Sequence, residues 1–344
     1  MKVLGFLKDS AWDKLDAVQF YRTFLPLREL SRHCPDGDIK CVGDEAVGTM
    51  SDDELGGRDI YTMSRMYKLD KCQEFVDEIH RRGGVLVLDT DDDLTEKYRL
   101  VSGRGDEFLE VLGMMDYVTV STPPLVTLLG PYCKREPVVL RNCVDSSWMQ
   151  NVAAKSRRIV EDSSTSIGLS GSPTHWRDWQ LPSVPLARIG KEYPDVSVLL
   201  HGDVPRYLQH ISKNSTVLNL GPVPFSIYPV LLRQFDILLC AVDSDDRFND
   251  GKSGLKALEC MALGVVPICS QFGPYLDLAA AGAPIVIIKE ESRDGWYEAM
   301  RNLLEHDDRR RHLSALGPAW VLKHRDMVNG GYKQWENFYR EIAD

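Results

Sequence analysis

The sequence has no excess of positive charge. Its 344 residues include 41 Lys and Arg against 51 Asp and Glu, so the formal net charge at pH 7 is −10. Proteins that bind nucleic acid or anionic membranes in a general way carry a broad basic surface. The charge balance therefore argues against that class of partner, although it leaves room for a local basic cleft.

The cysteines lack the spacing of metal or disulfide frameworks. Eight of them are spread along the chain without a C-x-x-C pair or a His-rich partner pattern. Zinc ribbons and secreted disulfide scaffolds show regular spacings. We therefore expect no zinc site, no disulfide framework and a reducing, cytoplasmic location.

Long apolar runs are also missing. The stretch that is poorest in charge, residues 259–288, is interrupted by three glycines and three prolines, whereas a membrane-spanning helix needs ~20 apolar residues without such breaks. The first residues meet charge at Lys8 after a short apolar run, which makes a poor signal peptide. We expect no integral membrane segment.

The sequence does contain a repeated alternation of apolar strands and helices. Expected strands cover 2–8, 60–63, 85–88, 117–120, 138–140, 167–169, 196–201, 217–220, 235–240, 265–269 and 284–288. Helical spacing marks 17–33, 71–82, 108–114, 254–263, 293–305 and a C-terminal segment. This alternation, repeated on both sides of the polar run 161–166, predicts an α/β fold with two doubly wound Rossmann-like domains.

The predicted domains are residues 1–155 and 156–322, followed by a C-terminal helix in 323–344. In open parallel sheets, ligands bind beyond the carboxyl ends of the strands. We therefore expect a site in the strand-to-helix loops, with the two domains facing across a cleft.

The segment 248–267 has the strongest chemical pattern. Gly251 and Gly254 let the backbone approach a ligand closely. A helix predicted to begin near Ser253 directs free N–H groups and its positive dipole end toward the same loop, and Lys252 adds a full charge. This is a phosphate-binding design, although it lacks the Walker A spacing. Glu259, about two turns into the helix, has the chemistry to accept hydrogen bonds from a ribose diol.

The same segment resembles the donor-binding region of glycosyltransferases of the GT-B fold, notably a divergent branch of the retaining family 4 group. The family pattern is an acidic residue, seven others, then Glu in a helix that leads into A-x-G-x-P-V. Glu259, Met261-Ala262, Gly264 and Pro267 match its second half. The acidic position falls on Gly251, which departs from the pattern, although Asp250 is adjacent. The string Lys252, Ser253, Lys256, Glu259 looks like a variant of the same motif.

The resemblance implies roles for particular residues. Glu259 would bind the nucleotide ribose, and Lys252 with the amides of Ser253 and Gly254 would hold the diphosphate. The loop after the first strand of the second domain, Gly171-Ser172, would face the same diphosphate. His175 and Arg177 follow that loop and are the candidates for contact with the phosphates or the leaving group.

In the first domain the resemblance implies an acceptor side. Asp16 and Arg22 belong to a segment similar to the opening loop and helix of such enzymes, and Asp91, Asp92 and Asp93 would contact acceptor hydroxyls. Each has a simpler alternative, because Asp is favoured at helix N-caps and Arg on solvated helix faces. The C-terminal helix would pack back on the first domain.

The implied activity is transfer of a sugar, with retention, from a nucleotide sugar, most commonly a UDP-sugar, to an acceptor hydroxyl. No cofactor and no divalent metal are expected. The sequence leaves the acceptor open among a glycan, a lipid-linked sugar, a small molecule, a protein and a hydroxylated nucleic-acid base.

Other classes remain as alternatives. A nucleotide-sugar epimerase of the same fold would need extra His and carboxylate groups in the first domain, where His33 and His80 are expected on helix bodies. A metal-dependent GT-A-like transferase would use Asp89 and Asp91 to hold a cation. A third alternative is a non-catalytic sugar- or nucleotide-binding protein.

Overall fold

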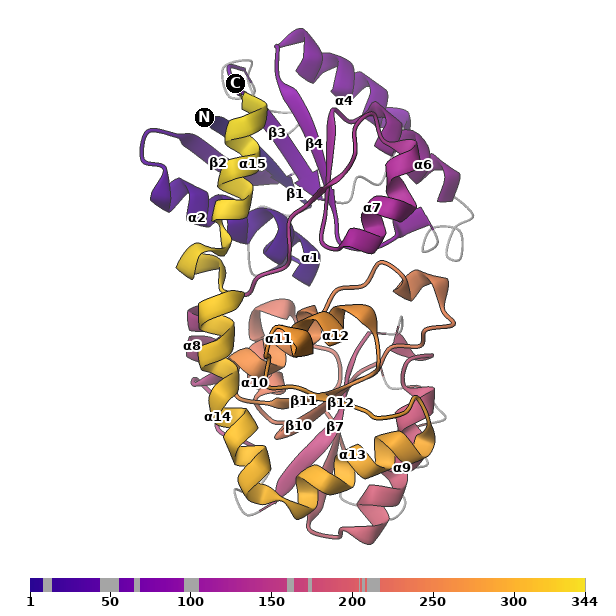
Figure 1. The fold of residues 1–344 in the computed structure, drawn as a ribbon. Coiled ribbons are helices and arrows are strands. Elements are labelled where there is room, and N and C mark those ends of the chain that lie inside the picture. Colours follow the sequence, from indigo (N-terminus) through magenta and orange to yellow (C-terminus); the bar gives the residue numbers. More distant parts are fainter. Residues whose placement is uncertain are drawn as a thin grey trace. The chain divides into compact units, whose positions relative to one another are not determined.

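The computed structural model describes residues 1–8, 14–43, 56–64, 69–95, 105–159, 164–172, 175–203, 205, 208 and 217–343. The chain forms two compact units. The first contains Met1–Cys143, Arg247–Ser253 and Met327–Asp344, and the second contains Val144–Asp246 and Gly254–Asp326. Each unit is an α/β structure built on one six-stranded sheet (Figure 1).

The first unit has a parallel sheet in the order β2-β1-β3-β4-β5-β6. Its strands are β1 (Lys2–Leu7), β2 (Asp38–Gly43), β3 (Ile60–Ser64), β4 (Val85–Thr90), β5 (Tyr117–Val120) and β6 (Val138–Val139). Its helices are α1 (Ala17–Gln19), the π-helical turn η2 (Phe20–Phe24), α2 (Leu25–His33), α4 (Leu69–Arg81), α6 (Gly105–Met114), α7 (Pro123–Leu129) and α15 (Lys333–Ala343). Helix α15 packs against α2 (Figure 1).

The second unit has a parallel sheet in the order β12-β11-β10-β7-β8-β9. Its strands are β7 (Thr165–Gly171), β8 (Val196–Gly202), β9 (Val217–Asn219), β10 (Ile237–Cys240), β11 (Val266–Cys269) and β12 (Val286–Ile287). Its helices are α8 (Ser146–Ala153), α9 (Gln180–Glu192), α10 (Tyr228–Leu232), α11 (Leu255–Ala262), α12 (Gly273–Ala280), α13 (Arg293–Glu305) and α14 (Asp307–His324). The strand order reverses between β7 and β10, which makes that point the topological switch.

The apolar pattern of the sequence explains both cores. In the first unit, buried side chains of β1, β3, β4 and β5 pack with those of α4, α6 and α7. In the second, β7, β8, β10 and β11 pack with α9 and α13, which also contact each other (Figure 1). Strands covered on both faces read as continuous apolar runs, which is why the sequence located them well.

Several elements were not predicted from the sequence, and three of them show why. Strand β2 lies at an edge of its sheet and carries Lys40, a residue typical of edge strands. Helix α9 contains Pro182 and Pro185, which weaken a helical pattern. Helix α8 lies where the periodicity loosens, and it packs against α10, α11 and α14.

The compact units divide at other places than the predicted domains. The first division falls after Cys143 and not after residue 155, because α8 makes its contacts within the second unit. The last falls after Asp326, close to the predicted 322. The segment Arg247–Ser253 belongs to the first unit, although the chain on both sides of it belongs to the second.

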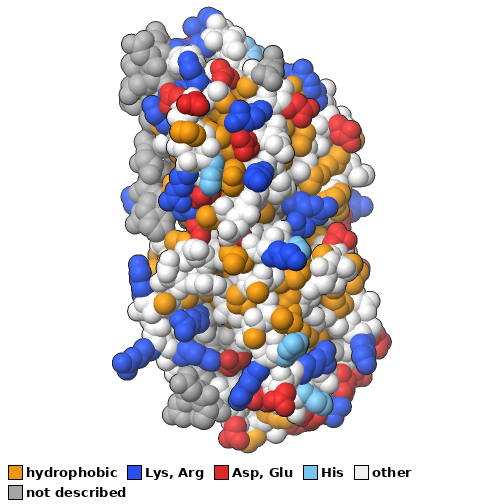
Figure 2. Space-filling view, turned by 60° about the vertical axis from the view of Figure 1, so that its left-hand side comes forward, with side chains coloured by type: hydrophobic (Ala, Val, Ile, Leu, Met, Phe, Trp, Pro, Cys, Tyr) orange, Lys and Arg blue, Asp and Glu red, His pale blue; other side chains and the backbone are white. Residues whose placement is uncertain are grey.

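All eight cysteines are free thiols. Within the described ranges, no helix is both long and apolar enough to cross a bilayer. On the face drawn in Figure 2, Lys and Arg side chains are interspersed with Asp and Glu and form no continuous basic surface.

Candidate functional site

A group of polar side chains gathers beyond the carboxyl ends of β7 and β8 in the second unit. Ser170 is fully buried near the end of β7, and its Oγ lies 2.8 Å from Nδ1 of His201 near the end of β8. The same Oγ lies 3.4 Å from the hydroxyl of Tyr228 on α10. We call Ser170, His201, Tyr228, Lys256 and Glu259 the switch-point cluster.

Helix α11 supplies the charged members of this cluster. Lys256 and Glu259 are three residues apart, so they share one side of the helix. The Nζ of Lys256 donates a hydrogen bond of 2.7 Å to the carbonyl oxygen of Ser170. Glu259 is buried, with 5% of its surface exposed. A buried carboxylate and a cation therefore lie on one side of α11, near the switch point of the sheet.

The cluster changes the titration of its own members. Burial, with the charge of Lys256, lowers the pKa of His201 to about 4. Its imidazole is therefore neutral at pH 7, and its buried Nε2 has no hydrogen-bond partner among the described residues. Desolvation and the carboxylate of Glu259 hold the pKa of Tyr228 well above its usual range. Neutral hydrogen-bonding groups thus surround one positive and one negative side chain.

The backbone is tightly packed at this edge of the sheet. Gly202 ends β8 with φ +101, and a Cβ there would overlap the carbonyl oxygen of Gly171 at the end of β7. Only glycine combines this conformation with this contact at low cost. The ends of the two strands therefore lie close together beside the cluster.

The residues predicted around the diphosphate loop have partners of their own. His175 packs on Gly171, and its Nδ1 lies 2.7 Å from a carboxylate oxygen of Asp178. Ser172 accepts a backbone hydrogen bond from His175. Arg177 has an exposed side chain that pairs with Asp243 at 3.1 Å. The contact of Arg177 with a carboxylate weakens its assignment as a catalytic cation.

The predicted donor segment is divided between the two units. Gly254 and the helix that follows it belong to the second unit, whereas Lys252 and Ser253 belong to the first. Helix α11 begins at Leu255, with Gly254 as its N-cap and no side-chain cap. The Nζ of Lys252 lies over the ring of Phe248 at 5.1 Å from its centroid.

Two side chains of the first unit hold the segment Arg247–Ser253. The Oγ1 of Thr122 donates a hydrogen bond of 2.9 Å to the carbonyl oxygen of Gly251, and Nδ2 of Asn142 donates one of 2.9 Å to Oγ of Ser253. A Cβ at Gly251 would overlap the side chain of Leu125. A larger residue at this position, where the family pattern has an acidic one, would therefore require the side chain of Leu125 to move.

Arg22 does not occupy the acceptor-side position that the sequence predicted. Its side chain is fully buried on the π-helical turn η2, where Nε and Nη2 donate hydrogen bonds of 2.8 and 2.7 Å to the two oxygens of Asp89. Its Nη1 donates to Asn142, and its guanidinium lies 5.2 Å from the ring centroid of Trp335. This arginine therefore links η2, the sheet and α15, and presents no charge to solvent.

The other acceptor-side candidates are one helix N-cap, Asp16, and three aspartates in the loop after β4. Asp16 is the N-cap of α1, and its side chain accepts a hydrogen bond from the backbone N–H of Gln19. Asp93 caps the turn after β4 by accepting from the N–H of Thr95. Asp91 and Asp92 are half-buried in the same loop. Asp16 is exposed, whereas the three carboxylates of the loop are half-buried.

The metal alternative rested on Asp89 and Asp91. Both oxygens of Asp89 accept from Arg22, and Oδ2 also accepts from Thr119 at 2.6 Å. Among the described residues, no group of three or more His, Cys, Asp or Glu side chains is arranged to hold a metal ion. The geometry thus gives Asp89 a role in packing.

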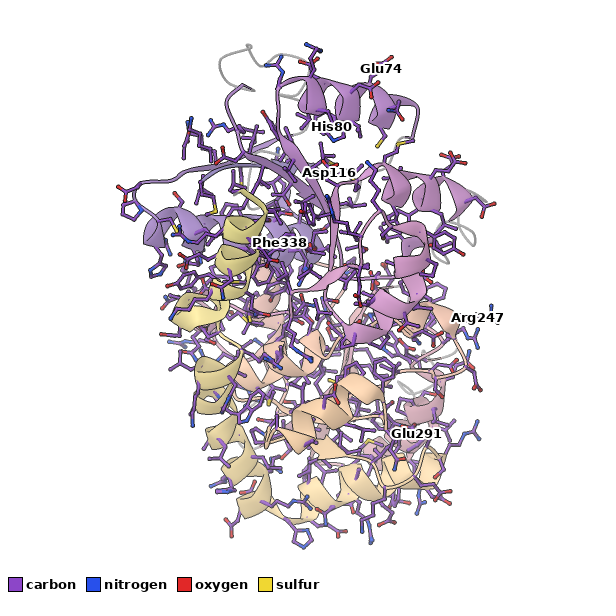
Figure 3. The ribbon with its side chains drawn as sticks, turned by 45° about the horizontal axis from the view of Figure 1, so that its top comes forward. Glu74, His80, Asp116, Arg247, Glu291 and Phe338 are labelled. Atoms are coloured by element: carbon purple, nitrogen blue, oxygen red, sulfur yellow. The ribbon has the colours of Figure 1, made fainter. Side chains whose placement is uncertain are left out.

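The epimerase alternative required histidines and carboxylates at a ligand-binding edge. Figure 3 shows His80 on α4 pointing toward Asp116, and Nε2 of His80 lies 2.8 Å from that carboxylate. Asp116 immediately precedes β5, so the pair lies at the amino end of the sheet. His33 stacks on Tyr332 with ring centroids 4.2 Å apart. Neither histidine is placed for chemistry at the carboxyl edge.

Four members of the cluster, Ser170, His201, Tyr228 and Lys256, were not predicted as site residues; Ser170 directly precedes the predicted loop residue Gly171. Lys256 belongs to the motif string, and its spacing of three residues from Glu259 is the sequence signal that places it beside that residue. His201 ends an expected strand, and such positions border ligands in doubly wound sheets. Tyr228 had no distinguishing signal, because a short helix brings it to the cluster.

No protein-family model matches the chain, and no curated protein matches its sequence. Solved structures do resemble it. HepE from Anabaena, in complex with UDP and glucose, superposes with a TM-score of 0.69 at 12% identity, covering 99% of this chain and 100% of that one. Sucrose-phosphate synthase from Thermosynechococcus elongatus gives a TM-score of 0.70 at 11% identity, covering 99% of each chain. A glycosyltransferase from Rickettsia africae gives a TM-score of 0.64 at 13% sequence identity, covering 99% of this chain and 98% of that one. The chain therefore has the two-domain α/β fold known as GT-B.

Proposed function

We propose that the protein is a glycosyltransferase that moves a sugar from a nucleotide sugar to an acceptor hydroxyl. The observation that carries the proposal is the switch-point cluster, in which buried Glu259 and Lys256 share one side of α11 at the carboxyl edge of a doubly wound sheet. That edge is where such sheets bind nucleotides. The likeness in fold to HepE, which was solved with UDP, UDP and glucose, and UDP-glucose, favours a UDP-sugar as donor.

The chemistry of the cluster suggests how the donor is held. The carboxylate of Glu259 would accept hydrogen bonds from a ribose diol, the role that the motif resemblance implies. Lys256 would offset negative charge that develops on the departing diphosphate. Neutral His201 offers Nε2 as a further hydrogen-bonding atom without adding charge. Lys252 would contribute from the segment that precedes α11.

A substitution of Glu259 tests the donor site. In the Glu259→Gln variant, we expect UDP affinity measured by calorimetry to fall at least tenfold, because a charged hydrogen-bond acceptor to the ribose is replaced by a weaker neutral one. Glu298→Gln on the exposed face of α13 is the matched control and should leave affinity unchanged. Unchanged affinity in Glu259→Gln would reject the ribose assignment. Binding by the wild type without UDP release in any acceptor screen would favour a binding protein.

We further propose that transfer proceeds with retention and without a metal ion. Positive charge from lysine and helix amides then replaces the cation, and the leaving phosphate takes the proton of the acceptor hydroxyl. Release of UDP from UDP-glucose should therefore continue in EDTA, and the anomeric coupling constant of the product should match that of the donor. Loss of activity in EDTA with recovery on adding Mn²⁺ would overturn the metal-free mechanism.

A further inference from the structure

The second unit contains a cavity that the proposed transfer reaction does not use. It has a volume of about 470 Å³, within the range of small-molecule sites. Thr165 begins β7 and Asp236 immediately precedes β10, so the cavity opens at the amino ends of these strands. The switch-point cluster lies at the opposite ends. In Figure 1 the corner between α13 and α14, which also borders the cavity, lies away from α11 and α12.

The charged lining of the cavity has a positive surplus. Among the described residues that line the cavity, three arginines (Arg158, Arg310 and Arg311) face two aspartates (Asp236 and Asp307). The other described lining residues are Ser164, Thr165, Gly264, Leu304 and Ser314. On α14, the carboxylate of Asp307 forms ion pairs with the guanidinium groups of both Arg310 and Arg311. One carboxylate cannot occupy all the donors of two guanidinium groups. This side of the cavity therefore keeps hydrogen-bond donors and positive charge for a ligand.

The opposite wall adds an unsatisfied donor. Arg158 donates hydrogen bonds of 3.0 and 2.9 Å to the two oxygens of Asp236, and Ser166 donates two more to the same carboxylate. Although burial alone raises it, these hydrogen bonds hold the pKa of Asp236 below its usual value. The charge of Asp236 is thus fully engaged. The Nε of Arg158 is buried and has no acceptor among the described residues, and an unmade buried hydrogen bond is costly.

The serine hydroxyl groups that line the cavity suit the hydroxyl groups of a ligand and not its phosphate. Ser164 Oγ donates to the carbonyl oxygen of Asp195 at 2.6 Å, and Ser314 Oγ donates to that of Gly264. Because their protons are used, these hydroxyls offer only lone pairs to a ligand. Such acceptors suit the hydroxyl groups of a polyol, whereas guanidinium groups suit the terminal oxygens of phosphate.

We propose that this cavity binds a phosphorylated polyol of the size of a hexose phosphate. The arginines of α14, with Arg158, hold the phosphate, and the serine hydroxyls accept hydrogen bonds from the polyol. A phosphate monoester has three terminal oxygens and a charge near −2 at neutral pH, so the single surplus positive charge of the described lining offsets part of it. The volume exceeds what a phosphate ion alone fills.

Calorimetric titration of the full chain tests the proposal. Glucose 6-phosphate, inorganic phosphate and glucose are titrated at constant ionic strength, each with and without saturating UDP. We expect saturable binding of glucose 6-phosphate that persists in the presence of UDP, weaker binding of phosphate, and none of glucose. Equal affinity for phosphate and glucose 6-phosphate would overturn the claim that the cavity recognises the polyol. Absence of binding would overturn the whole proposal.

Variants locate the binding. Arg310→Gln/Arg311→Gln should weaken glucose 6-phosphate at least tenfold and leave UDP binding unchanged, with folding checked by circular dichroism. Arg301→Gln/Arg309→Gln removes the same charge from residues that do not line the cavity, and it should bind as the wild type does. Undiminished binding in Arg310→Gln/Arg311→Gln would place the ligand elsewhere and overturn the assignment. The result does not depend on transferase activity, so the two proposals can fail separately.

Discussion

His201 illustrates how one buried side chain couples the site to stability. In an unfolded chain its pKa is near 6.5, and in the folded protein burial and Lys256 lower it to about 4. The folded state therefore favours the neutral imidazole. This preference contributes stability that is present above pH 6.5 and is lost as the pH falls toward 4.

A pH series checks this residue. We expect the wild type to lose roughly 3 kcal/mol more unfolding free energy than His201→Asn does between pH 7 and pH 4, since one pKa unit corresponds to about 1.4 kcal/mol. Urea unfolding at several pH values measures the difference. His324→Asn, an exposed position on α14, should give the wild-type profile. Parallel profiles for wild type and His201→Asn would contradict the lowered pKa.

Single residues also mark what the sequence could and could not predict. Glu259 was predicted in a helix after a glycine-rich loop, and it is found there, buried on α11. Arg22 was predicted on a helix, as observed, but its orientation toward Asp89 depends on a π-helical turn and on Trp335 from the far end of the chain. Such long-range pairs leave no local pattern, because the partners are separated by many residues in the sequence.

At the scale of elements, α11 depends on its packing against α14. A Cβ at Gly317 of α14 would lie 2.8 Å from the backbone oxygen of Met261 on α11. Real Cβ atoms do not approach a backbone atom this closely, so a larger residue would separate the two helices. Helix α11 carries Lys256 and Glu259, and its position is therefore tied to a glycine on a neighbouring helix.

Gly317→Ala tests this contact. We expect a loss of about 1–3 kcal/mol in unfolding free energy, the usual cost of overpacking, together with weaker UDP binding. Gly113→Ala is the matched control, because position 113 is exposed on α6 and its Cβ would meet its nearest neighbour at 3.6 Å. It should be neutral or stabilising by up to ~1 kcal/mol, since Ala favours helix. Equal effects of the two substitutions would contradict the packing argument.

Local sequence patterns predicted some helices and strands accurately and missed others. Strand β5 and helix α13 were predicted at their observed bounds, because continuous apolar runs and clear helical spacing define them. Strand β2 and helix α9 were not predicted, since an edge strand is half-solvated and prolines interrupt the helix. The switch-point cluster combines residues from β7, β8, α10 and α11, and only tertiary structure brings those four elements together.

At the scale of the whole molecule, each unit is completed by distant parts of the chain. Helix α15 belongs to the first unit, where Trp335 is buried against Arg22 and the hydroxyl of Tyr339 donates to Thr62 at 3.3 Å. The sequence predicted a C-terminal helix with this aromatic spacing. Its resemblance to GT-B enzymes implied the return to the first unit.

Trp335→Ala tests this dependence. We expect a loss of about 3–5 kcal/mol, with faster amide hydrogen exchange in β1, β3 and α2 and little change in β7, β8 and α13. Leu322→Ala, an exposed position on α14, should change neither set. Equal loss of protection in both units would show that the chain unfolds as one cooperative block, contrary to this expectation.

The segment Arg247–Ser253 has a consequence for how such proteins diversify. Because it and residues 327–344 belong to the first unit, neither unit is a contiguous cassette. Recombination at a single breakpoint near residue 143 would pair a first unit with a foreign loop and a foreign C-terminal helix. The foreign loop would then replace the residues that now contact Thr122, Leu125 and Asn142. A chimera that keeps the first unit intact needs all three of its segments exchanged together. Substitution of single residues is therefore a simpler route to a new specificity than exchange of whole units.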